Sequence, residues 1–142
     1  MKFLYCGIFF LAFFYTGLAQ ERYLKVTSGG GVTGIATQYK ISPDGKVLRG
    51  KGLGDIKFTE EAKLKKCRVK KQFDEAERIL AIHHDFNHPG NLYYSIKLFN
   101  QGKESQITWG DSEYEVPEDA GKLYTKINKA LARLTFVPDM RK

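Results

Sequence analysis

Cysteine is scarce in this 142-residue sequence, which contains two, Cys6 and Cys67. Cys6 lies in an apolar N-terminal stretch that we expect to be removed, so one thiol remains and no internal disulfide can form. The folded domain must therefore be held together by its core. We expect Cys67 to be buried and unreactive, because a free cysteine behaves as a small hydrophobic residue. The alternative is a reactive thiol activated by the neighbouring lysines.

Charge is almost absent from residues 1–19, where Lys2 is the only charged side chain and a long apolar run follows it. The run ends in Gly17-Leu18-Ala19, with small residues at the positions that signal peptidase reads. We therefore expect residues 1–19 to be a signal peptide, which predicts an exported protein, periplasmic or extracellular. An uncleaved membrane anchor is the alternative, because the run has about the minimum length of a membrane span. Residues 20–142 show no repeat or linker and are predicted to form a single domain.

The sequence also lacks the motifs of the common enzyme classes. It has no Gly-Lys-Ser or Gly-Lys-Thr phosphate loop, no Gly-x-Ser-x-Gly nucleophile motif and no His-Glu-x-x-His zinc motif. We therefore expect neither an enzymatic activity nor a cofactor.

Histidine occurs three times, always within the stretch HHDFNH. His83 falls on the apolar stripe of a predicted helix, so we expect it to pack in the core. His84 and His88 have the i, i+4 spacing that can converge on one metal ion, but Pro89 predicts that the helix has ended before His88. We expect no metal site. A metal-binding or enzymatic protein that uses this cluster is the alternative.

Apolar residues that alternate with period two predict strands at residues 22–28, 35–42, 46–50, 91–99 and 104–109. Apolar residues at helical spacing predict amphipathic helices at residues 73–85 and 117–134. The intervening residues 55–71 fit two interpretations: a strand at residues 64–69 with Cys67 and Val69 facing inward, which we favour, or a helix capped by Thr59. The order of elements predicts an α+β fold, an antiparallel sheet of about five to six strands with two amphipathic helices packed on one face.

The segment SGGGVTG, residues 28–34, places four glycines between two predicted strands. A phosphate cradle would require a following helix, whereas residues 35–42 alternate as a strand does. One interpretation is a hairpin loop in which glycines adopt positive φ. The other is an exposed loop that binds a partner protein, with these contact residues: Ser28, Gly29, Gly30, Gly31 and Gly34. Trp109, beside a predicted turn, is a further candidate for partner contact, and burial at the end of the core is its alternative.

Positive charge is concentrated in two places in a sequence of net charge +7. One is residues 63–71, and the other is a face of the last predicted helix with Lys122, Lys126, Lys129 and Arg133. Such faces are usually solvated, and attraction to an anionic surface or polyanion is the alternative. We expect no nucleic-acid partner, because no recognised nucleic-acid-binding motif is present. Membrane contact is expected only through the signal peptide.

The order of these features resembles the emfourin family, small protein inhibitors of thermolysin-like metalloproteases, and related exported bacterial proteins. The resemblance rests on these residues and features: Gly29, Gly30, Gly34, Pro89, Tyr93 or Tyr94, and the closing helix. The signal peptide, the hairpin SPDGKVLRGKGLG and the lysine-rich segment depart from the family pattern. The glycine loop at residues 28–34 is the segment that we expect to enter or cover the target's groove. The resemblance itself implies only that the target is another protein, a metallopeptidase. It assigns no individual inhibitory residue.

Overall fold

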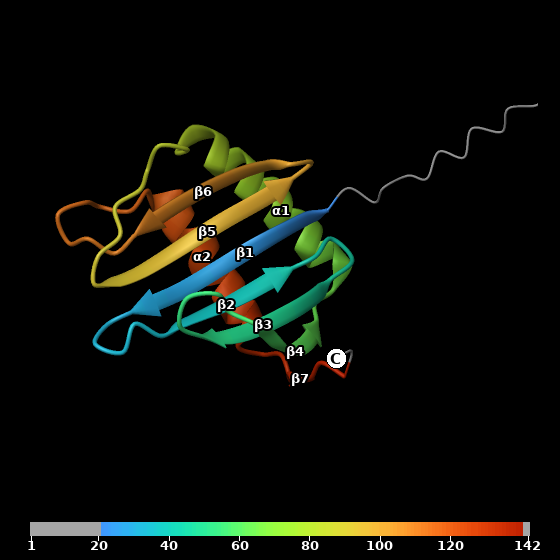
Figure 1. Ribbon diagram of the computed structural model, residues 1–142. Coiled ribbons are helices and arrows are strands. Elements are labelled where there is room, and N and C mark those ends of the chain that lie inside the picture. Colours follow the sequence, from blue (N-terminus) through green and yellow to red (C-terminus); the bar gives the residue numbers. More distant parts are fainter. Residues whose placement is uncertain (1–20, 141–142) are drawn as a thin grey trace, which may run out of the picture.

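The computed structural model describes residues 21–140, which form one seven-stranded antiparallel sheet with two helices on one face (Figure 1). The strands are β1 (Arg22–Gly30), β2 (Ala36–Ile41), β3 (Lys46–Gly52), β4 (Phe58–Lys63), β5 (Leu92–Asn100), β6 (Lys103–Trp109) and β7 (Val137–Pro138). The helices are α1 (Lys66–Ile82) and α2 (Glu118–Leu131). The strand order is β6-β5-β1-β2-β3-β4-β7. The predicted α+β fold class is confirmed, whereas the predicted signal peptide lies outside the described residues.

Strand β1 shows why the sheet has one buried face. It pairs with β2 on one side and, along its full length, with β5 on the other. Leu24 and Val26 of β1 are almost completely buried, and because side chains alternate along a strand, Lys25 lies on the opposite face. The register places Ile41 of β2 and Ile96 of β5 on the same side as these two residues, where both are buried.

Each helix covers this face of the sheet with an apolar stripe. The buried apolar residues of α1 are Val69, Phe73, Ala76, Ile79 and Leu80. Those of α2 are Ala120, Leu123, Ile127, Ala130 and Leu131. The first turn of α2 also contains Glu118 and Asp119, whose carboxylates complement the positive end of the helix dipole. Neither helix within residues 21–140 has the length and apolar content needed to cross a bilayer.

The predicted strand at residues 64–69 is wrong, because these residues lead into and begin α1, while the strand before them is β4. Val69 belongs to the buried helical stripe with Phe73. The polar Gln72 interrupts that stripe in the sequence and so conceals where the helix begins. The expected burial of Cys67 is wrong for the same reason, since Cys67 lies in the first turn of α1 and is exposed.

Two further details concern the ends of elements. Helix α1 ends at Ile82 and His83 is its C-cap, with a side chain that is 28% exposed, so the expected core position of His83 is wrong.

The short strand β7 was not predicted from the sequence, and it pairs with β4 at one edge of the sheet. At the other edge, the Thr108 N–H of β6 donates to the Phe86 carbonyl at 3.1 Å. Both edges are therefore partly covered, which limits pairing with other chains.

The exposed position of Cys67 and the buried position of Ile79 predict contrasting effects of substitution in α1. Cys67→Ser should change the free energy of unfolding by less than about 0.5 kcal/mol, because substitutions at exposed positions have small effects. Ile79→Ala should lower it by about 2–5 kcal/mol, since Ile79 is fully buried. Urea unfolding measures both values, and a thiol reagent should label Cys67 in the folded protein. Labelling that occurs only after unfolding would contradict the exposed position.

Candidate functional site

The glycine-rich segment joins β1 to β2 at one end of the sheet (Figure 1). Strand β1 extends through Gly29 and Gly30, so these residues belong to the strand and the turn follows them. Gly30, Gly31 and Gly34 have φ values of 98°, 74° and 63°, a region that residues with side chains rarely adopt. The Gly31 N–H donates to the Asn91 carbonyl at 2.8 Å, and the Gly34 N–H donates to the Gly31 carbonyl at 3.1 Å. The segment is a defined turn between strands.

Two of these glycines are also required by close packing. A Cβ atom on Gly30 would lie 2.0 Å from the carbonyl oxygen of Asn91, which precedes β5. A Cβ atom on Gly29 would lie 2.6 Å from the Ala36 Cβ and 2.9 Å from the Tyr93 hydroxyl oxygen. Gly29 and Gly30 therefore allow neighbouring segments to close against the end of β1. Of the glycines predicted to contact a partner, Gly31 and Gly34 lie on the turn itself.

Apolar side chains that were not predicted from the sequence surround this turn. Val32 is fully exposed, and the exposed fractions of Ile35, Leu53 and Leu92 are 38%, 66% and 56%. The Cδ2 atoms of Leu92 and Leu53 lie 3.4 Å and 3.3 Å from where Cβ atoms on Gly31 and Gly34 would be. We call residues 30–35 together with Leu53 and Leu92 the β1–β2 tip. One sequence signal could have indicated it: residues 28–39 contain no charged side chain, although 27% of the sequence is charged.

Trp109 is only 9% exposed and lies on the helix side of the sheet. It pairs with Tyr94 of β5, which in turn pairs with Ser28 of β1. The Trp109 ring packs edge-to-face on Tyr124 of α2, with ring centroids 5.1 Å apart. The Tyr124 hydroxyl donates to the Thr27 carbonyl at 3.4 Å, and burial raises the pKa of Tyr124. Trp109 is therefore buried at the end of the core, which was the alternative to partner contact in the sequence analysis. The aromatic cluster of Trp109, Tyr94 and Tyr124 supports the end of the sheet that carries the β1–β2 tip.

The three histidines contact different neighbours. The His83 Nε2 lies 3.2 Å from the Asp119 Oδ1 at the start of α2. His84 is exposed and its Nε2 lies 3.1 Å from the carboxylate of the next residue. The His88 ring stacks on Tyr114 with a centroid separation of 3.6 Å. In the part of the chain that the structure describes, no three His, Cys, Asp or Glu side chains are grouped to hold a metal ion.

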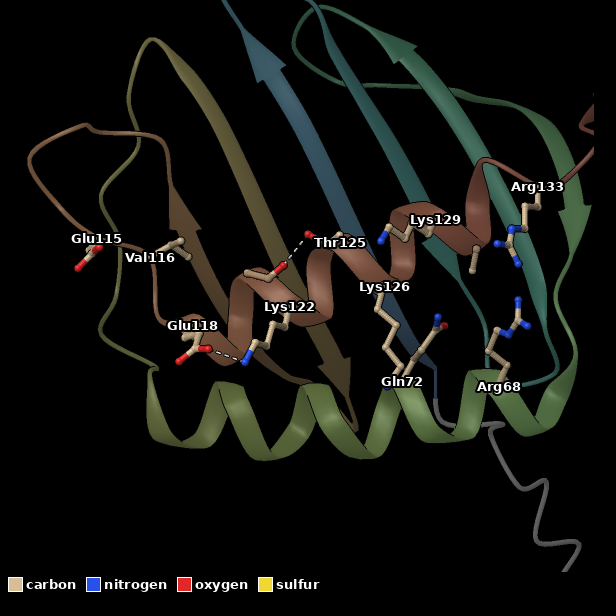
Figure 2. A pocket seen from close by; sticks show the side chains of 12 residues that line it. Arg68, Gln72, Glu115, Val116, Glu118, Lys122, Thr125, Lys126, Lys129 and Arg133 are labelled. Carbon is tan, nitrogen blue, oxygen red and sulfur yellow. Dashed lines mark hydrogen bonds and ion pairs between the residues drawn. The ribbon is translucent and has the colours of Figure 1, made fainter.

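The basic face predicted on α2 forms a separate feature, because its four cations line a groove between α1 and α2 (Figure 2). The Lys122 Nζ lies 2.5 Å from the Glu118 Oε1, and this hydrogen bond lowers the pKa of Glu118 and raises that of Lys122. The Lys126 Nζ lies 2.6 Å from the Glu75 Oε2 of α1. The groove shares no residue with the β1–β2 tip.

Comparison with protein-family models and with curated proteins finds no match for this chain. The resemblance to the emfourin family stays a prediction. The geometry of the β1–β2 tip, an exposed apolar cluster on a hydrogen-bonded turn, is the basis for assigning a function.

The close contact at Gly30 predicts a large effect of adding one methyl group. Gly30→Ala should lower the free energy of unfolding by at least about 2 kcal/mol, because the added Cβ meets the Asn91 carbonyl and the positive φ is unfavourable for alanine. Gly52→Ala is the matched control, since a Cβ on Gly52 meets no atom of residues 21–140 within 4 Å. Urea unfolding compares the two variants. Equal stability would show that Asn91 does not approach β1 as closely as the structure indicates.

Proposed function

We propose that this domain binds another protein by placing the β1–β2 tip in a recessed apolar site, and that the partner is a peptidase whose cleft the tip occludes. The observation that carries the proposal is Val32, which is fully exposed on a turn whose neighbouring large side chains are also apolar. Burying one such side chain stabilises a complex by about 1.5–3 kcal/mol. Large apolar side chains gathered at one exposed place are typical of interaction sites.

The backbone of the β1–β2 tip favours binding without rearrangement. The hydrogen bond from Gly31 to Asn91 ties the turn to the segment before β5, and the internal bond between Gly34 and Gly31 closes it. Figure 1 shows this turn at the end of the sheet, where neither α1 nor α2 covers it. A loop that is ordered before binding loses less conformational entropy in the complex. The turn is therefore already ordered before it binds a partner.

The chemistry of the tip restricts the chemistry of its partner. Because residues 28–39 carry no charge, the complementary surface is expected to be apolar and its binding nearly independent of salt. The peptidase class is supported by the resemblance to the emfourin family. Occlusion of a cleft requires a stable scaffold and one projecting loop, and no catalytic residue of its own.

Val32→Asn tests the tip, with Val137→Asn as its matched control. Val137 is also exposed, at 51%, but lies in the edge strand β7. The purified protein should inhibit cleavage of a peptide substrate by a thermolysin-like metallopeptidase. Val32→Asn should raise the inhibition constant by roughly 10- to 100-fold, because one apolar side chain no longer enters the cleft. Val137→Asn should leave the constant within about twofold of the parent value.

Three results would count against the proposal. Equal inhibition by the two variants would remove Val32 from the interface. Failure to inhibit any of a panel of metallo-, serine and cysteine peptidases would overturn the assignment to peptidases. A strong fall in affinity at high salt would show that the interface is charged and lies elsewhere on the domain.

A further inference from the structure

The groove between α1 and α2 has a volume of about 1170 Å³ and is rich in positive charge. Figure 2 shows it from the side of the helices, with side chains of both helices reaching into it. Its cationic residues are Arg68 of α1 and Lys122, Lys126, Lys129 and Arg133 from α2 and the residues after it. Two carboxylates, Glu115 and Glu118, line the same groove.

The cations fall into two groups along the groove. Lys122 and Lys126 are neutralised by ion pairs with Glu118 and Glu75. Two other cations, Arg68 and Arg133, lie at the end of the groove where α1 begins and α2 ends, while the Lys129 side chain extends from the last turn of α2 toward Thr125. Within residues 21–140, none of these three cations forms an ion pair with a carboxylate. Figure 2 shows the guanidinium groups of Arg68 and Arg133 pointing toward each other. Like charges that face one another repel, and an anion between them removes that repulsion.

The start of α1 adds to the positive potential at this end. Its first turn contains no acidic residue, and its N-cap, Lys65, makes no side-chain hydrogen bond to the helix. Carboxylates and capping side chains are favoured at such positions because they complement the helix dipole. In this chain, Lys66 and Arg68 occupy the first turn instead. The sequence thus concentrates cations where helix stability alone would favour anions.

Gln72 is a second and independent indication of a ligand. It lies one turn after Arg68 on α1, lines the same groove and is 0% exposed. Among the described residues, neither its Nε2 nor its Oε1 has a hydrogen-bond partner. Buried polar atoms are rarely left unpaired, because an unmade hydrogen bond is unfavourable in the interior. A ligand oxygen in the groove would supply the acceptor that the Gln72 amide lacks.

We propose that this end of the groove binds a phosphomonoester group through Arg68, Arg133 and Gln72, which we call the Arg68/Arg133 site. Two guanidinium groups can each form paired hydrogen bonds with phosphate oxygens. A dianion would balance the two charges, which no carboxylate within residues 21–140 pairs with. The groove continues past Ala130 and Gly121 to Val116, which provides room for the organic part of the ligand. The phosphate can belong to a soluble ester or to the headgroup of phosphatidic acid. This site is independent of the peptidase-binding proposal.

Titration of the purified protein with inorganic phosphate, followed by NMR, tests the site. Saturable shifts should centre on the resonances of Arg68, Gln72 and Arg133. The double variant Arg68→Gln/Arg133→Gln should raise the dissociation constant at least about tenfold, because both bidentate contacts are lost. The matched control, Lys57→Gln/Lys103→Gln, removes the same charge from two exposed positions outside the groove and should change the constant less than about twofold.

Gln72→Leu separates a ligand-binding role from a structural one. The substitution keeps the side-chain volume and removes the unpaired amide, so the urea midpoint should rise. Phosphate binding should weaken about threefold or more, because one hydrogen bond to the anion is lost. A variant with a higher urea midpoint and unchanged phosphate affinity would remove Gln72 from the site and overturn the proposal in its present form.

Vesicles identify the source of the phosphate. Binding to phosphatidylcholine vesicles that contain phosphatidic acid, with loss of binding in the arginine double variant, would assign the site to a lipid headgroup. Saturable phosphate binding without vesicle binding would assign it to a soluble ester. Shifts that do not saturate, or equal losses in the arginine and lysine double variants, would overturn the site, because both results indicate attraction by net charge alone.

Discussion

The register of β1 between β2 and β5 is the constraint on which the rest of the structure depends. A shift of one residue would turn Leu24 and Val26 toward solvent and place Lys25 under the helices. Lys25 is half-buried even on the open face, where burial lowers its pKa, so a position under the helices would be far less favourable. The same register brings Leu92 opposite Gly30 at the end of β1. The exposed tip therefore follows from pairing within the sheet.

Local sequence patterns were sufficient to predict most of the fold. They failed at elements whose position depends on tertiary contacts. Alternation along residues 91–99 and the apolar stripe of α2 gave correct elements because each has one fully apolar face. The start of α1 was not predicted because the polar Gln72 interrupts the apolar stripe of the helix. Cys67 and Val69 happen to alternate with charged residues, as in a strand, which led to the wrong prediction of a strand there. Strand β7 has two residues and exists only through its pairing with β4, which no local pattern encodes.

The candidate site was predictable only in its backbone. Glycines in a short loop indicate positive φ, and Gly31 and Gly34 adopt it. The role of Gly29 depends on Tyr93, which is distant in sequence, so it could not be deduced from neighbouring residues. The apolar tip combines Val32 with Leu53 and Leu92 from two other segments, and only the sheet order brings the three together.

Gln72 concealed the start of α1 in the sequence, and the same residue lines the groove between the two helices. A polar residue on an otherwise apolar stripe weakens the helical pattern, and the Gln72 amide has no hydrogen-bond partner within residues 21–140. Natural sequences tend to break a local rule at functional positions, where the loss of stability is offset by a role in binding. The uncharged β1–β2 tip and the cationic Arg68/Arg133 site differ in the physics of recognition, since burial of apolar area is insensitive to salt and attraction between ions is screened by it. If both proposals hold, the effect of ionic strength should distinguish binding at the tip from binding at the Arg68/Arg133 site.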